Sequence, residues 1–370
     1  MRAAVLHEFG RPMGLEEVRL ADPRAGEVLV RILAAGVCHS DLHYMIGDLK
    51  CPLPVILGHE GAGIVEQVGP GVERIAKGDL VVLMWRPRCG HCVFCSTGRP
   101  AMCVSAKILG ATGGLLDGTS RLSLADGREL HHFLGVSCFA EFAVVAQESL
   151  VKIPSRTPHR IAALVGCAVV TGVGAALNVM GPDTGPGSGV LVIGAGGVGL
   201  SVVIGAALIG AHPILVADTR DDRLKLAASL GATHLVDVGQ EELVEAVHRV
   251  QRDGVQWVFE AVGKPDTLAA GVRCLRPTGT IVAIGLSAAD QTVSLPINYL
   301  VQREIRVVGS LYGSSNTITQ IPRLLELYEA GRLNLEKLIG SEYRLEQINE
   351  AFARLPTESV GRGLILMEAS

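Results

Sequence analysis

Four cysteines stand close together in the pattern C-x2-C-x2-C-x7-C, at Cys89, Cys92, Cys95 and Cys103. Four thiolates within so short a loop can close a tetrahedron around one Zn²⁺, and a zinc ion without an open position is structural. We therefore predict a structural zinc site in this loop. An iron–sulfur cluster is the first alternative, because closely spaced cysteines also suit it, and a disulfide pair is the second.

A second set of possible metal ligands is spread along the chain. Cys38 begins the run CHSDLH, which follows a predicted strand, and His59 lies between glycines in GHEGAG. Two thiolates and one imidazole, with Cys167 as the third ligand, would leave one zinc position open, as a Lewis-acid catalyst requires. No spacing rule joins these residues, and a lone cysteine in an apolar run often packs as a small apolar residue.

A glycine-rich turn follows a strand-like apolar run in VLVIGAGGVG, residues 190–199. Gly194 permits a tight turn, and Gly196, followed by Gly197, lets backbone amides approach a pyrophosphate. Gly199 allows the following helix to pack closely on the sheet, and the helix N-terminus offers donors to phosphate. The pattern predicts a dinucleotide site.

Asp218 ends the next predicted strand after this turn. A carboxylate there can accept hydrogen bonds from the ribose hydroxyls of the adenosine and would repel a 2′-phosphate. We therefore predict NAD rather than NADP, although Arg220 and Arg223 lie nearby.

Composition limits the class of protein that carries these motifs. The chain has 370 residues, of which 48% are hydrophobic and 19% charged, so a fibre, a disordered chain or a disulfide-stapled miniprotein is excluded. The length indicates two domains, with three as the alternative. The formal charge of −4 offers no strong basic field, so we expect no nucleic-acid partner.

Two kinds of domain follow from the order of the expected elements. Up to about residue 153, short alternating strands such as 27–33 and 63–68 are separated by Gly and Pro turns, which predicts a mostly β domain. Residues 110–132 are expected to form a long surface loop. From about residue 162, strands alternate with helices, as in a doubly wound parallel sheet of the α/β class. The expected strands are 189–193, 213–218, 234–237, 255–260 and 280–285, with an edge strand within 301–309 and a last strand near 363–367.

Residues 161–182 and 189–217 lack formal charge and are long enough to span a bilayer. Glycines break both stretches, so we interpret them as buried strand–turn–helix segments and expect no membrane association. We recognise no secretory signal at the N-terminus. Nine cysteines in such a chain are expected to be reduced, in the cytoplasm.

Taken together, these residues resemble the zinc-dependent medium-chain alcohol dehydrogenases over essentially the whole chain. The resemblance rests on GHE at 58–60 with the glycines after it, the four-cysteine loop, and the glycine turn followed by Asp218. The run HHFLG at 131–135 ends a long loop, as in the classical dimeric branch and its glutathione-dependent formaldehyde relatives. The resemblance implies a GroES-like catalytic domain of residues 1–168 and 311–370, a Rossmann NAD-binding domain of residues 169–310, and a homodimer.

The resemblance also implies roles for residues near the metal. Cys38, His59 and Cys167 would be the ligands of a catalytic zinc, the second of two zinc ions in each chain. Asp41 would orient the ligand histidine. Glu60 would lie behind the metal, either as an intermittent ligand or as a buried charge facing an arginine.

A proton relay and the rest of the cofactor site are implied in the same way. Ser40 would begin the relay and His43 would exchange the proton with water at the surface. His39 stands where relatives often carry an arginine against the pyrophosphate, and a neutral histidine there would hold NAD less tightly. The other implied cofactor contacts are Thr171, Val198, Arg223, Ile284, Leu286 and Arg362.

The implied substrate pocket is apolar. Trp85 would narrow its inner part and favour primary alcohols, and the other implied lining residues are Leu49, Ile108, Phe133, Leu134 and Leu286. Leu49 departs from the acidic outer pocket of the glutathione-dependent branch, whereas Lys107 stands where that branch has a basic residue.

The function that follows is an NAD-dependent alcohol dehydrogenase that interconverts primary alcohols and aldehydes, by alkoxide formation at zinc and hydride transfer. One alternative is oxidation of an S-(hydroxymethyl)thiol adduct of formaldehyde. A second alternative is a nucleotide-sensing protein without turnover, which would have no need of the relay residues Ser40 and His43.

Overall fold

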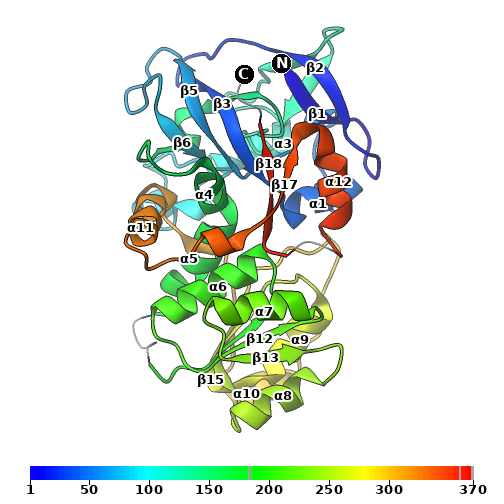
Figure 1. Ribbon diagram of the computed structural model, residues 1–370, viewed down its shortest axis with the longest axis vertical. Coiled ribbons are helices and arrows are strands. Elements are labelled where there is room, and N and C mark those ends of the chain that lie inside the picture. The colour runs from blue at the N-terminus through cyan, green and yellow to red at the C-terminus, as the bar shows by residue number, and fades with distance from the viewer. Residues whose placement is uncertain (182–183, 185, 358–359, 368–370) are drawn as a thin grey trace. The chain divides into compact units, whose positions relative to one another are not determined.

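The computed structural model describes residues 1–181, 184, 186–357 and 360–367 (Figure 1). By its internal contacts the chain divides into two compact units. The first comprises Met1–Cys167, Asn316–Leu325 and Ile339–Ser370, and the second Ala168–Ser315 and Glu326–Leu338. The expected boundaries assign 1–168 and 311–370 to the first domain, whereas the contacts group Ala168, 311–315 and Glu326–Leu338 with the second unit.

The first unit is mostly β and contains two sheets. A closed barrel has the order β1-β2-β7-β8-β4, and a seven-stranded sheet has the order β10-β6-β5-β3-β18-β17, with β9 also paired to β3. The strands are β1 (Arg2–Leu6), β2 (Gly14–Leu20), β3 (Glu27–Gly36), β4 (Val55–Ile56), β5 (Gly61–Val68), β6 (Leu80–Leu83), β7 (Leu122–Leu124), β8 (Glu129–His132), β9 (Phe142–Ala146), β10 (Leu150–Lys152), β17 (Ile339–Arg344) and β18 (Arg362–Leu366). Its helices are α1 (His39–Ile46), α2 (Val93–Ser96), α3 (Ala106–Thr112), α4 (His159–Leu164) and α12 (Ile348–Arg354).

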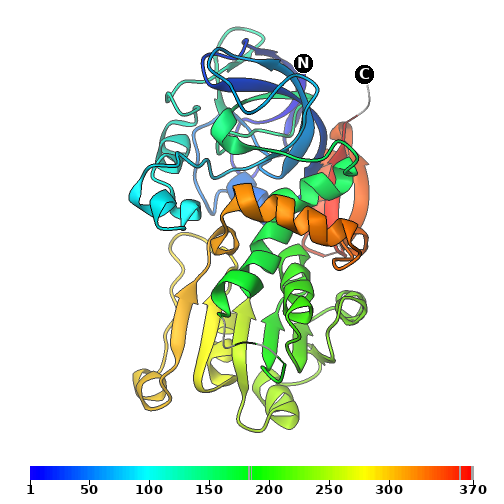
Figure 2. The same cartoon turned by 90° about the vertical axis from the view of Figure 1, so that its left-hand side faces the viewer.

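The second unit is the expected doubly wound parallel sheet. Six strands lie in the order β13-β12-β11-β14-β15-β16, and all neighbours are parallel. Figure 2 shows them side by side, with β16 at one edge. The strands are β11 (Val190–Ile193), β12 (Ile214–Asp218), β13 (His234–Asp237), β14 (Val255–Glu260), β15 (Leu275–Ala283) and β16 (Arg306–Gly309). The helices are α5 (Val170–Val179), α6 (Gly197–Leu208), α7 (Asp221–Ser229), α8 (Leu243–Val250), α9 (Pro265–Arg273) and α10 (Ile297–Gln302), and α11 (Thr317–Glu329) has residues in both units.

Burial explains why these sequences form these elements. The parallel strands are apolar almost throughout, as strands covered on both faces must be, and Leu191, Leu215 and Val258 are fully buried. In β3, by contrast, the charged residue Arg31 alternates with the buried residues Val30 and Ile32. The strand order reverses between β11 and β14, and the glycine turn that follows β11 therefore lies where doubly wound folds bind ligands.

Two of the sequence predictions are wrong in detail. Residues 110–132 do not form one loop, because β7 and β8 pair within them and join the barrel. Residues 159–179 form a continuous apolar helix rather than a strand, turn and helix, and Pro182 lies outside the described residues. That helix, His159–Val179, is long and apolar enough to cross a membrane, but 89% of its apolar window is buried inside the protein, as in the core helix of a globular fold.

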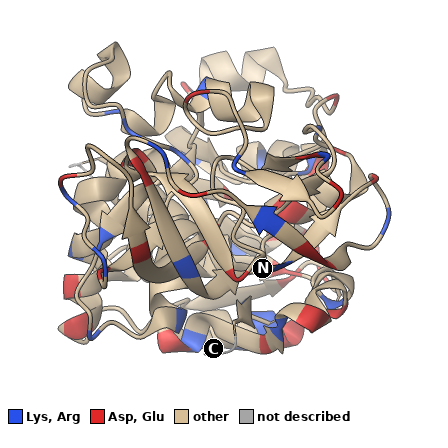
Figure 3. Cartoon of the chain, turned by 90° about the horizontal axis from the view of Figure 1, so that it is seen from above, with Lys and Arg blue, Asp and Glu red and all other residues tan. Residues whose placement is uncertain are grey.

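Charged residues of both signs are interspersed over the surface. Figure 3 shows Lys and Arg positions mixed with Asp and Glu positions, without a continuous strip of one sign. This distribution agrees with the small formal charge of −4.

Candidate metal centres and cofactor site

The three dispersed ligands come together in the first unit. Cys38, His59 and Cys167 are buried, and their ligand atoms lie within 4.8 Å of one another. The Cys167 Sγ atom is 3.4 Å from the His59 Nε2 atom. Tetrahedral zinc with ordinary Zn–S and Zn–N bonds would hold such a pair about 3.6 Å apart. The donor set and its spacing therefore fit one zinc ion with three protein ligands.

Each ligand sits at a special point of the backbone. Cys38 has an extended conformation directly before α1, and His59 follows Gly58. Gly58 has a φ of 92°, and a Cβ atom there would meet the Phe139 backbone nitrogen at 2.7 Å, so only glycine fits. Cys167 lies in a π-helical turn, Val165–Val169. Such turns are rare in proteins as a whole, but many of those that occur are found at functional sites.

Asp41 fixes the orientation of the histidine. The buried Asp41 carboxylate lies on the first turn of α1, and its Oδ1 atom is 3.0 Å from His59 Nδ1 and accepts a hydrogen bond from the Gly58 N–H at 3.2 Å. Hydrogen bonding at Nδ1 leaves Nε2 with its lone pair toward the two sulfurs. Burial lowers the pKa of His59, but the Asp41 carboxylate and the Cys38 sulfur together outweigh burial, and the pKa is raised well above its usual value.

The two sulfurs compete for one proton. Hydrogen bonding with Cys167 lowers the pKa of Cys38 well below its usual value, and the same bond raises the pKa of Cys167. Arg362 contributes to the lowering at Cys38. A buried, partly deprotonated pair of thiols beside an imidazole is a site that a divalent cation would stabilise.

Glu60 and Arg362 form a buried ion pair behind these ligands. Arg362 donates from Nε to Glu60 Oε2 at 2.9 Å and from Nη2 to the same oxygen. Burial raises the pKa of Glu60, and the Arg362 guanidinium opposes that shift. Of the two roles considered for Glu60, the structure has the carboxylate facing an arginine, and that arginine is the residue expected at the pyrophosphate.

The relay residues occupy one face of α1. Ser40 and His43 are three positions apart, so they share a helix face, and both are half-buried. His43 Nδ1 is 2.8 Å from Asp48 Oδ2, which holds the ring in place. His39, the first residue of the helix, is exposed.

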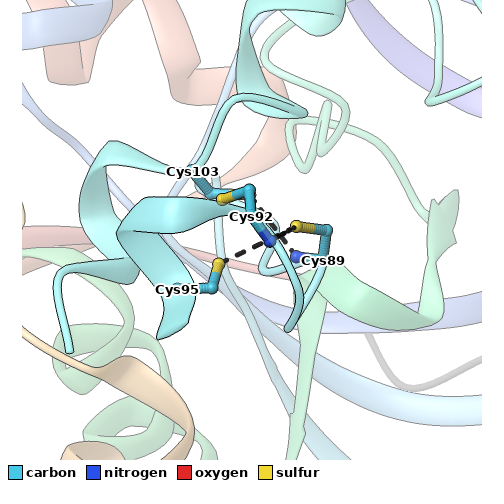
Figure 4. A group of neighbouring side chains, drawn as sticks. All are labelled: Cys89, Cys92, Cys95 and Cys103. Atoms are coloured by element: carbon cyan, nitrogen blue, oxygen red, sulfur yellow. Dashed lines mark hydrogen bonds between the residues drawn. The ribbon is translucent and has the colours of Figure 1, made fainter. Parts of the chain in front are cut away.

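The four-cysteine loop forms a second cluster. Figure 4 shows the four side chains converging from the loop around α2. Cys89 Sγ lies 3.9 Å from Cys95 Sγ, and Cys92 Sγ lies 4.0 Å from Cys103 Sγ. Sulfurs around one tetrahedral zinc would be about 3.8 Å apart. Backbone N–H groups lower the pKa of Cys92 to about 6, and burial raises the pKa of Cys95 to about 12.

The glycine turn of the second unit has room for a ligand where a cofactor requires it. A Cβ atom at Gly196 would meet nothing within 4 Å, so the backbone is open there. A Cβ atom at Gly199 would lie 1.8 Å from the Gly194 carbonyl oxygen, so the helix packs too closely for any side chain. Gly194 has a φ of 94°, as a tight turn demands. Gly197 is the first residue of α6.

Asp218 lies beside this turn. Its Oδ2 atom accepts a hydrogen bond from the Ala195 N–H at 2.8 Å, and its Oδ1 atom accepts one from the Arg220 N–H at 3.1 Å. Arg223 Nη1 is 4.0 Å from Asp218 Oδ2. The Asp218 carboxylate is therefore held at the end of β12 with the Arg223 guanidinium close to it. The negative charge that would disfavour the 2′-phosphate of NADP and a positive charge that would favour it lie side by side.

The remaining expected cofactor contacts lie on elements around the same turn. Thr171 precedes Gly172, whose absent side chain lets α5 approach α6, since a Cβ atom there would lie 2.3 Å from the Val198 carbonyl oxygen. Ile284 is half-buried and Leu286 is exposed after β15.

Two aromatic rings contact the histidine ligand, and a third packs against one of them. Trp85 and Phe133 approach the His59 ring edge-on, with centroids 6.1 and 6.0 Å away, and Tyr44 packs against Phe133 at 4.7 Å. The sequence indicated Trp85 and Phe133 but not Tyr44. Of the other expected pocket residues, Leu49 and Leu134 are half-buried, and Ile108 is exposed on α3 beside Lys107.

Comparisons with known proteins agree with this geometry. The family model described as alcohol dehydrogenase GroES-like domain matches residues 24–155, and the one described as zinc-binding dehydrogenase matches residues 197–329. The chain is 35% identical to alcohol dehydrogenase class-3 of Myxine glutinosa over 95% of this chain and 93% of that protein.

Two solved structures are similar over nearly their whole length. An alcohol dehydrogenase zinc-binding domain protein from Burkholderia ambifaria superposes with a TM-score of 0.94 at 36% identity, covering 100% of this chain and 99% of that one. Benzyl alcohol dehydrogenase from Acinetobacter calcoaceticus superposes with a TM-score of 0.92 at 32% identity, covering 99% of both chains.

Proposed function

Because the chain belongs to the zinc-dependent medium-chain alcohol dehydrogenase family, we propose that it interconverts primary alcohols and aldehydes with NAD(H). The observation that carries the proposal is the buried set of Cys38, His59 and Cys167, whose ligand atoms lie within 4.8 Å of one another. These three residues would hold a catalytic zinc, and the four-cysteine loop would hold a structural one.

A bound zinc ion would polarise the alcohol or aldehyde oxygen, and a bound nicotinamide would exchange hydride with the substrate carbon. The chain's own residues prepare the site for this chemistry. Asp41 would orient the His59 ring so that its Nε2 atom faces the two sulfurs, and Glu60 and Arg362 neutralise each other behind the ligands. Ser40 and His43, on one face of α1, would carry the alcohol proton toward solvent, with Asp48 holding the histidine ring.

The glycine turn and Asp218 support NAD as the cofactor. Gly196 leaves open space at the N-terminus of α6, where a pyrophosphate would meet free backbone donors, and Asp218 would accept from the ribose hydroxyls. A 2′-phosphate would meet the Asp218 carboxylate, which is why we propose NAD rather than NADP. His39, Thr171, Val198, Ile284 and Leu286 are proposed as further contacts.

The substrate is proposed to be a primary alcohol with an aromatic or hydrocarbon body. Trp85 and Phe133 approach the His59 ring and Tyr44 packs against Phe133, in a chain in which only 4% of residues are aromatic. The similarity to a benzyl alcohol dehydrogenase supports the same class. Leu49, Ile108, Leu134 and Leu286 are proposed as the apolar remainder of the pocket.

The second candidate is oxidation of a thiol adduct of formaldehyde. The similarity to a class-3 alcohol dehydrogenase and the exposed Lys107 on α3 favour it. Leu49, which is apolar and half-buried, does not offer the acidic outer pocket of that branch.

A panel of alcohols with NAD or NADP, with and without glutathione and formaldehyde, tests these candidates by the absorbance of the reduced cofactor. We expect the fastest turnover with NAD and primary aromatic alcohols. Turnover only with glutathione and formaldehyde would favour the second candidate. Nucleotide binding without any turnover would instead support a sensor.

A homodimer is proposed from the edge of the second unit. β16 ends the sheet and leaves one row of backbone donors and acceptors unpaired, and Ile297, Val301 and Val307 beside it are 75%, 70% and 43% exposed. A second copy paired along β16 would cover them. The cytoplasm is proposed as the compartment, since none of the nine cysteines is joined to another in a disulfide.

A further inference from the structure

A buried hydroxyl ties the strand before the histidine ligand to the turn that follows Phe133. Ser137 is 2% exposed, and its Oγ atom accepts a hydrogen bond from the Phe133 N–H at 2.7 Å. The same hydroxyl donates to the Ile56 carbonyl oxygen at 2.9 Å. Ile56 ends β4, three residues before His59. One side chain therefore connects two segments that both lead to the metal ligand.

Both connected segments reach His59 itself. The Cys138 N–H donates to the carbonyl oxygen of Gly58, the residue directly before His59, at 3.0 Å. The Phe133 ring, which is fully buried, meets the His59 ring edge-on with 6.0 Å between the centroids. The orientation of the His59 ring thus depends on the placement of both segments, in addition to its contact with Asp41.

The backbone of the connecting turn is held in an unfavourable conformation. Leu134 and Ser137 have φ values of 51° and 53°, in the left-handed region that residues with a side chain rarely adopt. Residues of this kind persist only where the surrounding structure determines their conformation, and they are concentrated at active sites. The two hydrogen bonds of the Ser137 hydroxyl are part of what holds this turn in place.

We propose that Ser137 is a positioning residue for the catalytic metal site, because its hydroxyl holds the Phe133 ring and the segment that ends at His59 in one arrangement. The proposal rests on the zinc site of the function proposed above and adds a determinant of its metal affinity. Groups that orient a metal ligand contribute about 10- to 100-fold to affinity. The competing role is structural only, with the hydroxyl stabilising the fold without acting on the ligand.

The test measures zinc affinity by chelator competition in the wild type, Ser137→Ala and Ser137→Gly. The zinc ion held by Cys38, His59 and Cys167 is identified as the one that is absent from Cys38→Ser. Alanine removes the hydroxyl and keeps the strained φ, whereas glycine removes the strain as well, so we expect Ser137→Gly to be the more stable variant. We expect this zinc ion to bind about 10- to 100-fold more weakly in both variants.

Ser120→Ala is the matched control, because Ser120 makes the same pair of bonds within the barrel. Its hydroxyl accepts from the Leu122 N–H at 3.0 Å and donates to the Leu130 carbonyl oxygen at 2.5 Å, so it links β7 to β8. We expect this variant to have a lower melting temperature and an unchanged affinity for the zinc ion at His59.

Weaker binding of this zinc ion in both Ser137 variants, but not in Ser120→Ala, would support the inference. Unchanged affinity in the Ser137 variants, or an equal loss in Ser120→Ala, would overturn it in favour of the structural role. In both of these cases a wild type that holds the zinc ion and oxidises alcohols leaves the proposed function standing. If the wild type holds no zinc at Cys38, His59 and Cys167, the proposed function fails and this inference fails with it.

Discussion

His132 is predicted to make the stability of the protein fall as the solution becomes acidic. It is the last residue of β8 and is buried, and its Nε2 atom accepts a hydrogen bond from the Arg121 backbone N–H at 3.1 Å. Burial, and then the charge of Arg121, lower its pKa from 6.5 to about 3. A proton on Nε2 would have to displace that hydrogen bond, so the folded protein keeps the ring neutral.

The size of the effect follows from linkage. In the unfolded chain His132 binds a proton as the pH falls below its ordinary pKa of 6.5, whereas in the folded chain it does so only near pH 3. The contribution of the neutral ring to the free energy of unfolding is therefore fully present above pH 6.5. It is lost as the pH falls from 6.5 toward 3. Between pH 7 and pH 5 this residue should cost about 2 kcal/mol of unfolding free energy. For a unit of this size that corresponds to a melting temperature lower by roughly 4–8 °C.

The matched variant is His132→Gln, because a glutamine oxygen can accept the same Arg121 hydrogen bond but cannot titrate. Calorimetric melting of both proteins at pH 7 and pH 5, in the same zinc concentration, isolates the contribution of His132. We expect the wild type to lose about 2 kcal/mol more than the variant over this interval. Melting curves that shift in parallel with pH would refute the reasoning.

Three further predictions concern the proposed metal and cofactor sites. Asp41→Asn should weaken zinc binding about 10- to 100-fold in a chelator competition, because an amide orients His59 less well; unchanged affinity would deny Asp41 that role. Gly196→Ala should weaken NAD binding in calorimetry without changing the melting temperature, whereas Gly199→Ala should lower the melting temperature by several degrees; the reverse pattern would contradict the turn geometry. Asp218→Ala should raise kcat/KM with NADP relative to NAD, and an unchanged ratio would count against the ribose contact.

The four-cysteine loop and the glycine turn could be predicted from the sequence, because the residues that form each site are close together along the chain. The four cysteines lie within 15 consecutive positions, and the glycine turn and Asp218 belong to consecutive strands, so periodicity and spacing were sufficient. The parallel sheet was predicted for the same reason, since its strands and helices alternate in a regular order.

Contacts across long sequence distances could not be predicted in this way. Glu60 and Arg362 are 302 positions apart, and only the pairing of β18 with β3 brings the arginine to the carboxylate. The residue types alone left Cys167 either a third ligand beside Cys38 and His59 or a packed apolar residue, and the family resemblance favoured the ligand, because no spacing rule joins a cysteine in a π-helical turn to the other two.

The predictions for residues 110–132 and for His159–Val179 were wrong for physical reasons. β7 has three residues and β8 has four, which is too short for an alternating pattern to be seen among polar residues. The helix at His159–Val179 is apolar on all sides because it is buried, and such a segment lacks the one-sided periodicity that separates a helix from a strand.

The central claim is that Cys38, His59 and Cys167 hold a zinc ion on which turnover depends. Metal analysis of Cys38→Ser, together with its NAD-dependent oxidation of benzyl alcohol, tests it most directly, and Cys51→Ser, a half-buried cysteine outside both clusters, is the control. We predict two zinc ions per chain in the wild type and in Cys51→Ser, and one zinc ion with activity lost in Cys38→Ser. Full activity in Cys38→Ser, or a single zinc ion in the active wild-type protein, would contradict the account.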